Sequence, residues 1–361
     1  DLICVDEASQ LPADYFMASL QFIKKVNIKI KKPTQMVLGK RIEDESVLNS
    51  LKVADSETSS DSLTKIVVVG DHNQLPPVRV KKPPKNLELI LDNIFRYYVE
   101  GHKISKKQLK INYRSHKDIV EFTSQLGLYD ELSAFKVNAV DLLKGDINKI
   151  KKDWLKEVMD PKRVVCSIIH YEQFEIGISI FEAQIVAEIV MGFYKMIQPN
   201  NKNEEFKFWS QKIGVVAPHN AQGRTILRKV FNLLIPMTQL SEGELMQALK
   251  STIYSVEKFQ GSDRDLIICS IGLSDEDKLQ MEEEFIYDLN RFNVLTSRAK
   301  NKIIFISSDQ FINYIPNERE LLKNSSKIYM YVQDFCNQEL SLHIKNKTTK
   351  KTQKIKLRYK N

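Results

Sequence analysis

The sequence has 361 residues, of which 42% are hydrophobic and 28% are charged, and its formal net charge at pH 7 is +8. This length is enough for two domains of ordinary size, each with a buried core. No apolar run approaches the roughly 18 residues of a membrane helix, and no signal peptide is visible, which argues against a membrane or secreted protein and predicts an intracellular one.

Short, β-branched apolar runs alternate with helical patterns along the chain. The runs are typical of buried parallel strands and comprise Leu2–Val5, Ile66–Val69, Val164–Ile169, Ile213–Ala217, Leu266–Ile271 and Ile303–Ile306. Helical patterns span residues 181–197 and 220–234. This alternation predicts open α/β sheets with helices on their faces.

Three stretches interrupt the alternation. Residues 24–65 are in part basic and in part polar without periodicity, which predicts an inserted surface loop. Residues 140–160 are interpreted as an inserted helix or hairpin. We expect the boundary between two domains near residues 101–110.

Two of the predicted strands end in polar side chains. The stretch VDEAS ends in Asp6 and Glu7, which could hold Mg²⁺ and activate a water, or could simply form a polar turn. The stretch IVVVGDHNQLPPV carries Asp71 and Gln74 after its strand, and Gln74 could sense a γ-phosphate or serve as a structural amide. Because ligands of open α/β sheets bind at the carboxyl ends of strands, we expect these four side chains around one crevice.

Two motifs in the middle of the chain carry candidate binding residues. LKINYRSH places Tyr113, which could stack on a base, beside Arg114, which could reach a nucleotide on the neighbouring domain. IGVVAPHNAQ leads from a strand through Pro218 to a helix start, where backbone amides and Asn220 or Gln222 could hold phosphates of a nucleic acid. A surface salt bridge and a core tyrosine are the alternatives for the first motif.

Two further motifs follow. SVEKFQGSDRDLIICSIG contains a Gln-Gly turn with Asp263 and Asp265 before a strand. NRFNVLTSRAK predicts a helix over 290–300, in which Arg291 and Arg298 share a face because they are seven residues apart. Each of these arginines would, taken singly, fit an ordinary surface cation.

The four cysteines, Cys4, Cys166, Cys269 and Cys336, form no C-x-x-C pair, so neither a zinc site nor an iron–sulfur cluster is expected. Three of them lie in apolar runs, which predicts small buried side chains in a reducing compartment.

The excess positive charge lies at the C-terminus. Residues 341–361 contain eight basic and no acidic residues, and the rest of the chain has 46 of each. We expect a disordered tail that adds salt-sensitive affinity for phosphate backbones or, equally, a solvated end without a specific role.

In order, VDEAS, GDHNQLPPV, NYRS, IGVVAPHNAQ, VEKFQGSDRD and RFNVLTSRAK resemble motif II and the later motifs through VI of superfamily 1 helicases. The FQG form of motif V resembles the branch with the nonsense-mediated-decay helicase, senataxin and the helicase–nuclease that trims Okazaki fragments. The resemblance covers residues 2–308. It implies two RecA-like P-loop NTPase-type parallel sheets with flanking helices, the first truncated at its N-terminus. The expected domains are 1–104, 105–316 and a C-terminal extension, 317–361, with the basic tail.

The resemblance also implies a catalytic set. Asp6 would coordinate Mg²⁺, Glu7 would activate the attacking water, and Gln74 would contact the γ-phosphate of ATP. Arg114 and Arg298 would be arginine fingers, each typically worth about 10³ to 10⁵ in rate.

Two binding sets are implied in the same way. The residues expected near the nucleotide are Tyr113, Gly261, Asp263 and Arg291. The residues expected to face single-stranded DNA or RNA are Pro218, His219, Asn220, Ser255 and Lys258.

The sequence departs from the family pattern at three places. Asp263 stands where the family usually has Glu, and VLTSRA replaces the commoner VALTRA. No G-x-x-x-x-G-K-[ST] loop occurs, since Gly39-Lys40 is followed by Arg41 and lacks an upstream glycine at the required spacing.

We therefore expect the C-terminal part of an ATP-driven, 5′-to-3′ helicase or translocase whose phosphate loop comes from the upstream part of the same polypeptide. This chain alone should hydrolyse little ATP. The alternative is a regulatory nucleic-acid-binding module without ATPase activity, for which Glu7, Gln74, Arg114 and Arg298 together would have no use.

Overall fold

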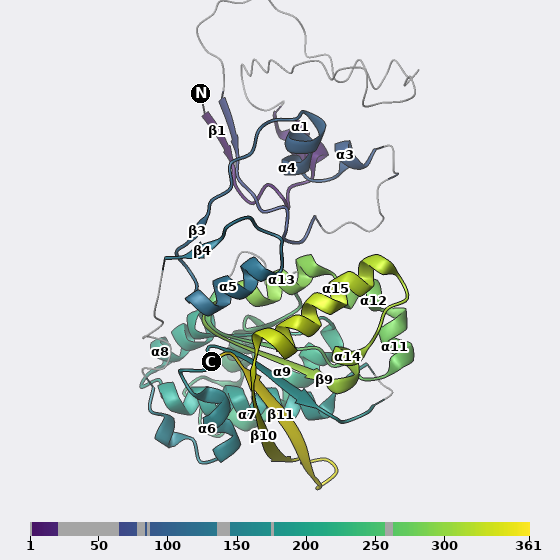
Figure 1. Cartoon of the computed structure of the whole chain (residues 1–361). Coiled ribbons are helices and arrows are strands. Elements are labelled where there is room, and N and C mark those ends of the chain that lie inside the picture. Colours follow the sequence, from purple (N-terminus) through teal and green to yellow (C-terminus); the bar gives the residue numbers. More distant parts are fainter. Residues whose placement is uncertain are drawn as a thin grey trace, which may run out of the picture. The chain divides into compact units, whose positions relative to one another are not determined.

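The computed structural model describes residues 2–20, 65–77, 84, 87–135, 145–174, 177–256 and 263–361. The chain divides into two compact units, Asp1–Lys107 and Gln108–Asn361 (Figure 1). The expected domain bounds, 1–104 and 105–316, stay a prediction. Most of the predicted inserted loop, 24–65, lies outside the described residues.

The first unit contains a pair of parallel strands, β1 (Leu2–Val5) and β2 (Lys65–Val68). Both strands were predicted. Its helices are α1 (Ala13–Leu20), α3 (Glu88–Leu91) and α4 (Ile94–Arg96), followed by the π-helical turn η1 (Tyr97–Gly101). Its core consists of small and aliphatic side chains around one ring: Val5, Ala8, Ala13, Phe16, Leu20 and Ile94.

The second unit is built on a seven-stranded sheet in the order β10-β11-β5-β9-β8-β6-β7. Its strands are β5 (Val165–His170), β6 (Ile213–Val216), β7 (Ile253–Tyr254), β8 (Arg264–Ser270), β9 (Ala299–Ser308), β10 (Gln338–Lys345) and β11 (Thr352–Tyr359). Strands β5 to β9 pair in parallel, and β11 joins β5 antiparallel. Every residue of β5 and β6 is buried, as expected for parallel strands covered on both faces. A separate short pair is formed by β3 (Ile111–Asn112) and β4 (Ser133–Ala134).

Helices cover both faces of this sheet (Figure 1). One face carries α6 (Asp153–Met159), α7 (Ile180–Ile197), α9 (Asn220–Leu234) and α10 (Glu242–Lys250), which share the largest core with the sheet. The other face carries α5 (Lys117–Gln125), α13 (Leu289–Ser297) and α15 (Arg319–Met330). Side chains of β9 alternate between the two faces of the sheet. Ile304 and Ile306 belong to the core shared with α7 and α9, and Phe305 packs against Phe292 of α13 on the other face.

The remaining helices of the second unit are short. They are η2 (Ile147–Lys149), α8 (Lys202–Lys207), η3 (Phe208–Lys212), α11 (Glu276–Met281), α12 (Glu283–Ile286), α14 (Asp309–Asn313) and η5 (Tyr331–Phe335). Among the described helices, none combines the length and the apolar composition that a membrane crossing requires.

The mixed α/β class with a mostly parallel central sheet is confirmed, and so are all six predicted strands and the helices over 181–197 and 220–234. The helix expected over 290–300 is shorter, because α13 ends at Ser297 and β9 begins at Ala299. Of the stretch 140–160, residues 147–149 and 153–159 are helical, and residues 140–144 lie outside the described ranges. Cys166 and Cys269 are buried as expected, but Cys4 is exposed.

The prediction of a disordered C-terminal tail is wrong. Residues 338–345 and 352–359 form the β10–β11 hairpin, and Ile355 of β11 pairs with His170 of β5. Apolar residues alternate with lysines, so that Ile344, Ile355 and Leu357 are buried while Lys345 and Lys354 are exposed. The hairpin is ordered despite its positive charge, because the period-two pattern places one face of each strand against the core.

Candidate nucleotide and nucleic-acid sites

The turn after β1 holds the two predicted carboxylates. Asp6 is exposed, and its Oδ1 accepts a hydrogen bond of 2.9 Å from the backbone N–H of Glu7. Glu7 has a backbone φ of +49°, a left-handed conformation that a glutamate rarely adopts. Its Oε2 accepts a 2.9 Å hydrogen bond from Nε2 of Gln10. Such strain in a carboxylate residue is a feature that clusters at functional sites.

The turn after β2 lies against the turn after β1. The N–H of Ala8 donates to the carbonyl of Val69 at 2.9 Å, and that of Val69 donates to the carbonyl of Val5 at 2.8 Å. A Cβ on Gly70 would lie 2.8 Å from the backbone nitrogen of Ser9, so only glycine permits this approach. The ends of β1 and β2 therefore meet at one edge, and a crevice lined by the four side chains stays a prediction.

Asp71 organises the second turn. Its Oδ2 accepts a 2.9 Å hydrogen bond from Nε2 of Gln74, and its Oδ1 accepts one of 3.0 Å from the N–H of Asn73. The amide of Gln74 is therefore held by a carboxylate at the same edge as Asp6 and Glu7.

The donor set at this edge suits a magnesium–nucleotide complex. In the part of the chain that the structure describes, no three His, Cys, Asp or Glu side chains form a cage for a metal ion. Mg²⁺ rarely needs such a cage, since one or two carboxylates together with substrate phosphates usually hold it. The exposed Asp6 fits that requirement.

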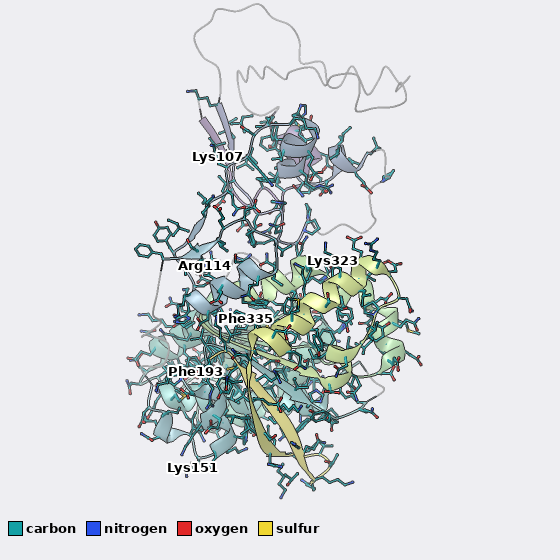
Figure 2. All side chains as sticks on the ribbon, in the orientation of Figure 1. Lys107, Arg114, Lys151, Phe193, Lys323 and Phe335 are labelled. Atoms are coloured by element: carbon teal, nitrogen blue, oxygen red, sulfur yellow. The ribbon has the colours of Figure 1, made fainter. Side chains whose placement is uncertain are left out.

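In the second unit, Arg114 follows β3 in a turn that long-range contacts fix (Figure 2). Oδ1 of Asn112 accepts hydrogen bonds from the N–H groups of Arg114, at 2.8 Å, and Ser115, at 3.0 Å. Oγ of Ser115 donates to the carbonyl of Ala299 at 2.8 Å, and the N–H of His116 donates to that of Lys300 at 2.7 Å. The turn is thereby attached to the start of β9.

Asp263 lies between two cations. Its Oδ2 is 3.1 Å from Nε of Arg114, and its Oδ1 is 2.7 Å from Nζ of Lys300. The carboxylate thus joins residues from three motifs, although its side chain is one carbon shorter than the Glu usual in the family. Arg298 is next to this set in the sequence, at the junction of α13 and β9, and only 2% of its surface is exposed.

Two other residues expected near the nucleotide, Tyr113 and Arg291, contact aromatic rings. Tyr113 is 60% exposed, and its ring centroid is 4.6 Å from that of Phe135. The guanidinium of Arg291 lies 3.8 Å from the ring centroid of Phe285. Gly261 lies outside the described residues.

Phe285 connects Arg291 to a residue of the predicted nucleic-acid face. The imidazole of His219 stacks on Phe285 with centroids 5.5 Å apart, and its Nε2 lies 2.7 Å from Oε2 of Glu282. Neither Phe285 nor Glu282 belongs to a recognised motif, so sequence reasoning missed both. No local pattern could have revealed their contacts with His219, because these are made across about 65 residues of chain.

The other residues predicted to face nucleic acid differ in exposure. Pro218 is buried, Asn220 is exposed at the start of α9, and Ser255 is half-buried after β7. Lys258 lies outside the described residues. Gln222 is fully buried, and its amide pairs with the backbone of Ser179 and with Oγ of Ser270. Of the two amides considered for phosphate binding, Asn220 remains a candidate and Gln222 is structural.

The comparisons with known proteins agree with these motifs. The family described as "AAA domain" matches residues 91–310. DNA replication ATP-dependent helicase/nuclease JHS1 of Arabidopsis thaliana is 28% identical over 259 residues, which are 69% of this chain and 17% of that protein. DNA replication ATP-dependent helicase/nuclease DNA2 of Mus musculus is 26% identical over 273 residues, 70% of this chain and 23% of that protein. An uncharacterized ATP-dependent helicase of Methanocaldococcus jannaschii is 25% identical over 265 residues, 72% of this chain and 34% of that protein. The matched region spans 17–34% of the length of these relatives.

Proposed function

This chain belongs to the AAA domain family, and we propose that it is part of a superfamily 1 helicase whose parent protein hydrolyses ATP to move along single-stranded DNA or RNA. The observation that carries the proposal is the parallel pairing of β1 with β2. That pairing supports the proposal because Asp6, Glu7, Asp71 and Gln74 follow strands that end at the same edge, where carboxylates could hold Mg²⁺ and position an attacking water.

In this proposal the first unit supplies the metal ligand and the base. Asp6 holds Mg²⁺, which neutralises the charge that develops on the phosphates. Glu7 accepts a proton from the attacking water, and Gln10 orients the carboxylate through its hydrogen bond. Gln74 contacts the γ-phosphate with its amide held by Asp71.

The second unit supplies positive charge. Arg114 and Arg298 stabilise the charge that builds up on the transferred phosphoryl group. Asp263 contacts Nε of Arg114, and 44% of the Arg114 side chain is exposed and accessible to an anion. Tyr113, Gly261, Asp263 and Arg291 complete the nucleotide-binding set.

The resemblance to superfamily 1 helicases suggests the substrate, the direction of movement and the location of the protein. Pro218, His219, Asn220, Ser255 and Lys258 are proposed to contact the nucleic-acid backbone, the direction of movement is 5′ to 3′, and the protein acts inside the cell. Because no G-x-x-x-x-G-K-[ST] loop occurs in this sequence, the proposal assigns the phosphate loop to another part of the parent polypeptide.

The test uses the parent protein with Glu7→Gln. We expect ATP turnover to fall to the background rate while nucleic-acid binding stays within about twofold, since the amide cannot accept the proton but keeps the shape. Glu88→Gln is the matched control, because Glu88 is an exposed glutamate on α3 of the same unit. Turnover that survives Glu7→Gln would show that the water is activated elsewhere.

A further inference from the structure

Helix α9 carries a stripe of exposed polar and basic residues. Asn220, Arg224 and Arg228 are four residues apart, lie on one side of the helix and are all exposed. No acidic residue occurs in residues 220–234, and no described carboxylate forms an ion pair with Arg224 or Arg228. Two fixed positive charges therefore extend from the residue already proposed to bind a phosphate.

The turn of the β10–β11 hairpin carries a second set of cations. Lys345, Lys350, Lys351 and Lys354 are exposed, and none forms an ion pair with a described residue. Lys347 is the exception, with its Nζ 3.0 Å from Oε1 of the buried Glu188.

The hairpin turn lies against α7, which shares a core with α9. The N–H of Lys347 donates to Oε1 of Gln184 on α7 at 2.7 Å. The pKa of Lys229 on α9 is lowered first by burial and then by the positive charge of Lys347.

A cavity of about 410 Å³ lies beside the hairpin turn. Its apolar wall includes Phe174, Ile178 and Phe181. Its polar wall consists of Glu172, Gln173, Asn346 and Thr348. Asn346 is 1% exposed, and its Nδ2 donates to Oε1 of Glu172 at 2.7 Å, which fixes the turn against the loop that follows β5. The cavity has room for a planar base next to an aromatic ring.

The cavity and the start of α9 belong to the same edge of the sheet. Ser179 follows the cavity residue Ile178, and its N–H donates to Oε1 of Gln222 at 3.0 Å. Gln222 is two residues beyond Asn220 on α9. The cavity therefore borders the residue that contacts the start of α9, and the hairpin turn lines the cavity.

We propose that these three features form a track for single-stranded nucleic acid, with phosphates on the basic residues of α9 and of the hairpin turn and one base in the cavity against Phe174. Single strands are bound in this way when a positive groove follows the backbone and an aromatic ring stacks on a base. The track rests on the proposed function and extends its nucleic-acid contacts from Asn220 to the C-terminal hairpin.

The test measures binding of a fluorescent oligothymidylate to residues 1–361 at several salt concentrations. For a single strand, each lost phosphate contact lowers the slope of log K against log salt by about 0.7. The double variant Lys351→Gln, Lys354→Gln should therefore lower the slope by about 1.4, and Arg224→Gln, Arg228→Gln should do the same. Phe174→Ala should weaken binding about tenfold without changing the slope, because stacking involves no counterion.

The matched control is Arg319→Gln, Lys323→Gln on α15. Both residues are exposed, and Figure 2 shows Lys323 far from the hairpin turn. This control should keep the wild-type slope. The proposed track is contradicted if the hairpin variant has the same slope of log K against log salt as the control and an unchanged thermal unfolding temperature. That result would leave the proposed motor function intact, because Glu7→Gln tests turnover in a separate assay.

Discussion

The two units hold their candidate catalytic residues by different kinds of contact. In the first unit the side-chain contacts are local, since Gln10 binds Glu7 and Gln74 binds Asp71, each three residues away. In the second unit, Asp263 binds Arg114 from about 150 residues further along the chain. The orientation of the carboxylate side chains therefore depends mainly on contacts within short motifs, and that of Arg114 on a contact between distant parts of the sequence. The following changes separate the two.

Arg114→Ala in the parent protein should have the largest effect. If the residue is an arginine finger, kcat for ATP should fall by about 10³ or more, measured as steady-state phosphate release. Arg114→Lys should recover little, because a lysine cannot reproduce the planar guanidinium. A loss of less than tenfold in both variants would remove Arg114 from the catalytic set.

Gly70→Ala should damage the first unit. The added Cβ would lie 2.8 Å from the nitrogen of Ser9 and 3.1 Å from that of Ala8, and these are backbone atoms that cannot turn away. We expect a cost of about 1–3 kcal/mol, seen as faster hydrogen exchange over residues 2–9 and 65–70. Unchanged exchange there would show that the two turns are not locked together.

Asp263→Asn should separate positioning from stability. Its ion pairs are about one third exposed, so the free energy of unfolding should change by less than about 1 kcal/mol. We expect kcat to fall about tenfold as Arg114 loses its anchor. Asp265→Asn is the control, because Asp265 binds Lys212 and neither of the candidate fingers. Equal kcat values for the two variants would contradict a positioning role.

Gly223→Ala in the second unit should have the smallest effect and the opposite sign to Gly70→Ala. No atom lies within 4 Å of a Cβ added at this position of α9. Alanine should stabilise the helix by about 0.5–1 kcal/mol, measured by urea unfolding. A destabilised variant would mean that α9 is packed more tightly at Gly223 than the structure indicates.

The same contrast explains which features were predictable from the sequence. The six strands and α9 follow from uninterrupted apolar runs and from a helical period, both of which are local signals. The C-terminal hairpin was predicted wrongly as a disordered tail. The eight basic residues favoured disorder, although Leu340, Leu342 and Ile344 alternate with polar neighbours as in a strand.

Tertiary contacts decided the rest of the candidate site. Both Asn220 and Gln222 stand at a helix start, and only the packing of Ser179 and Ser270 shows that Gln222 turns inward. Phe285 joins His219 to Arg291 without any motif of its own. Sequence patterns located the polar residues, and the long-range contacts determined their neighbours.

The most direct test of the central claim is phosphate release by the parent protein with and without a single strand of nucleic acid. The account predicts ATP hydrolysis that rises when the strand is added and disappears with Glu7→Gln. A parent protein that binds the strand yet releases no phosphate in either condition would contradict it and would identify a regulatory nucleic-acid-binding module instead.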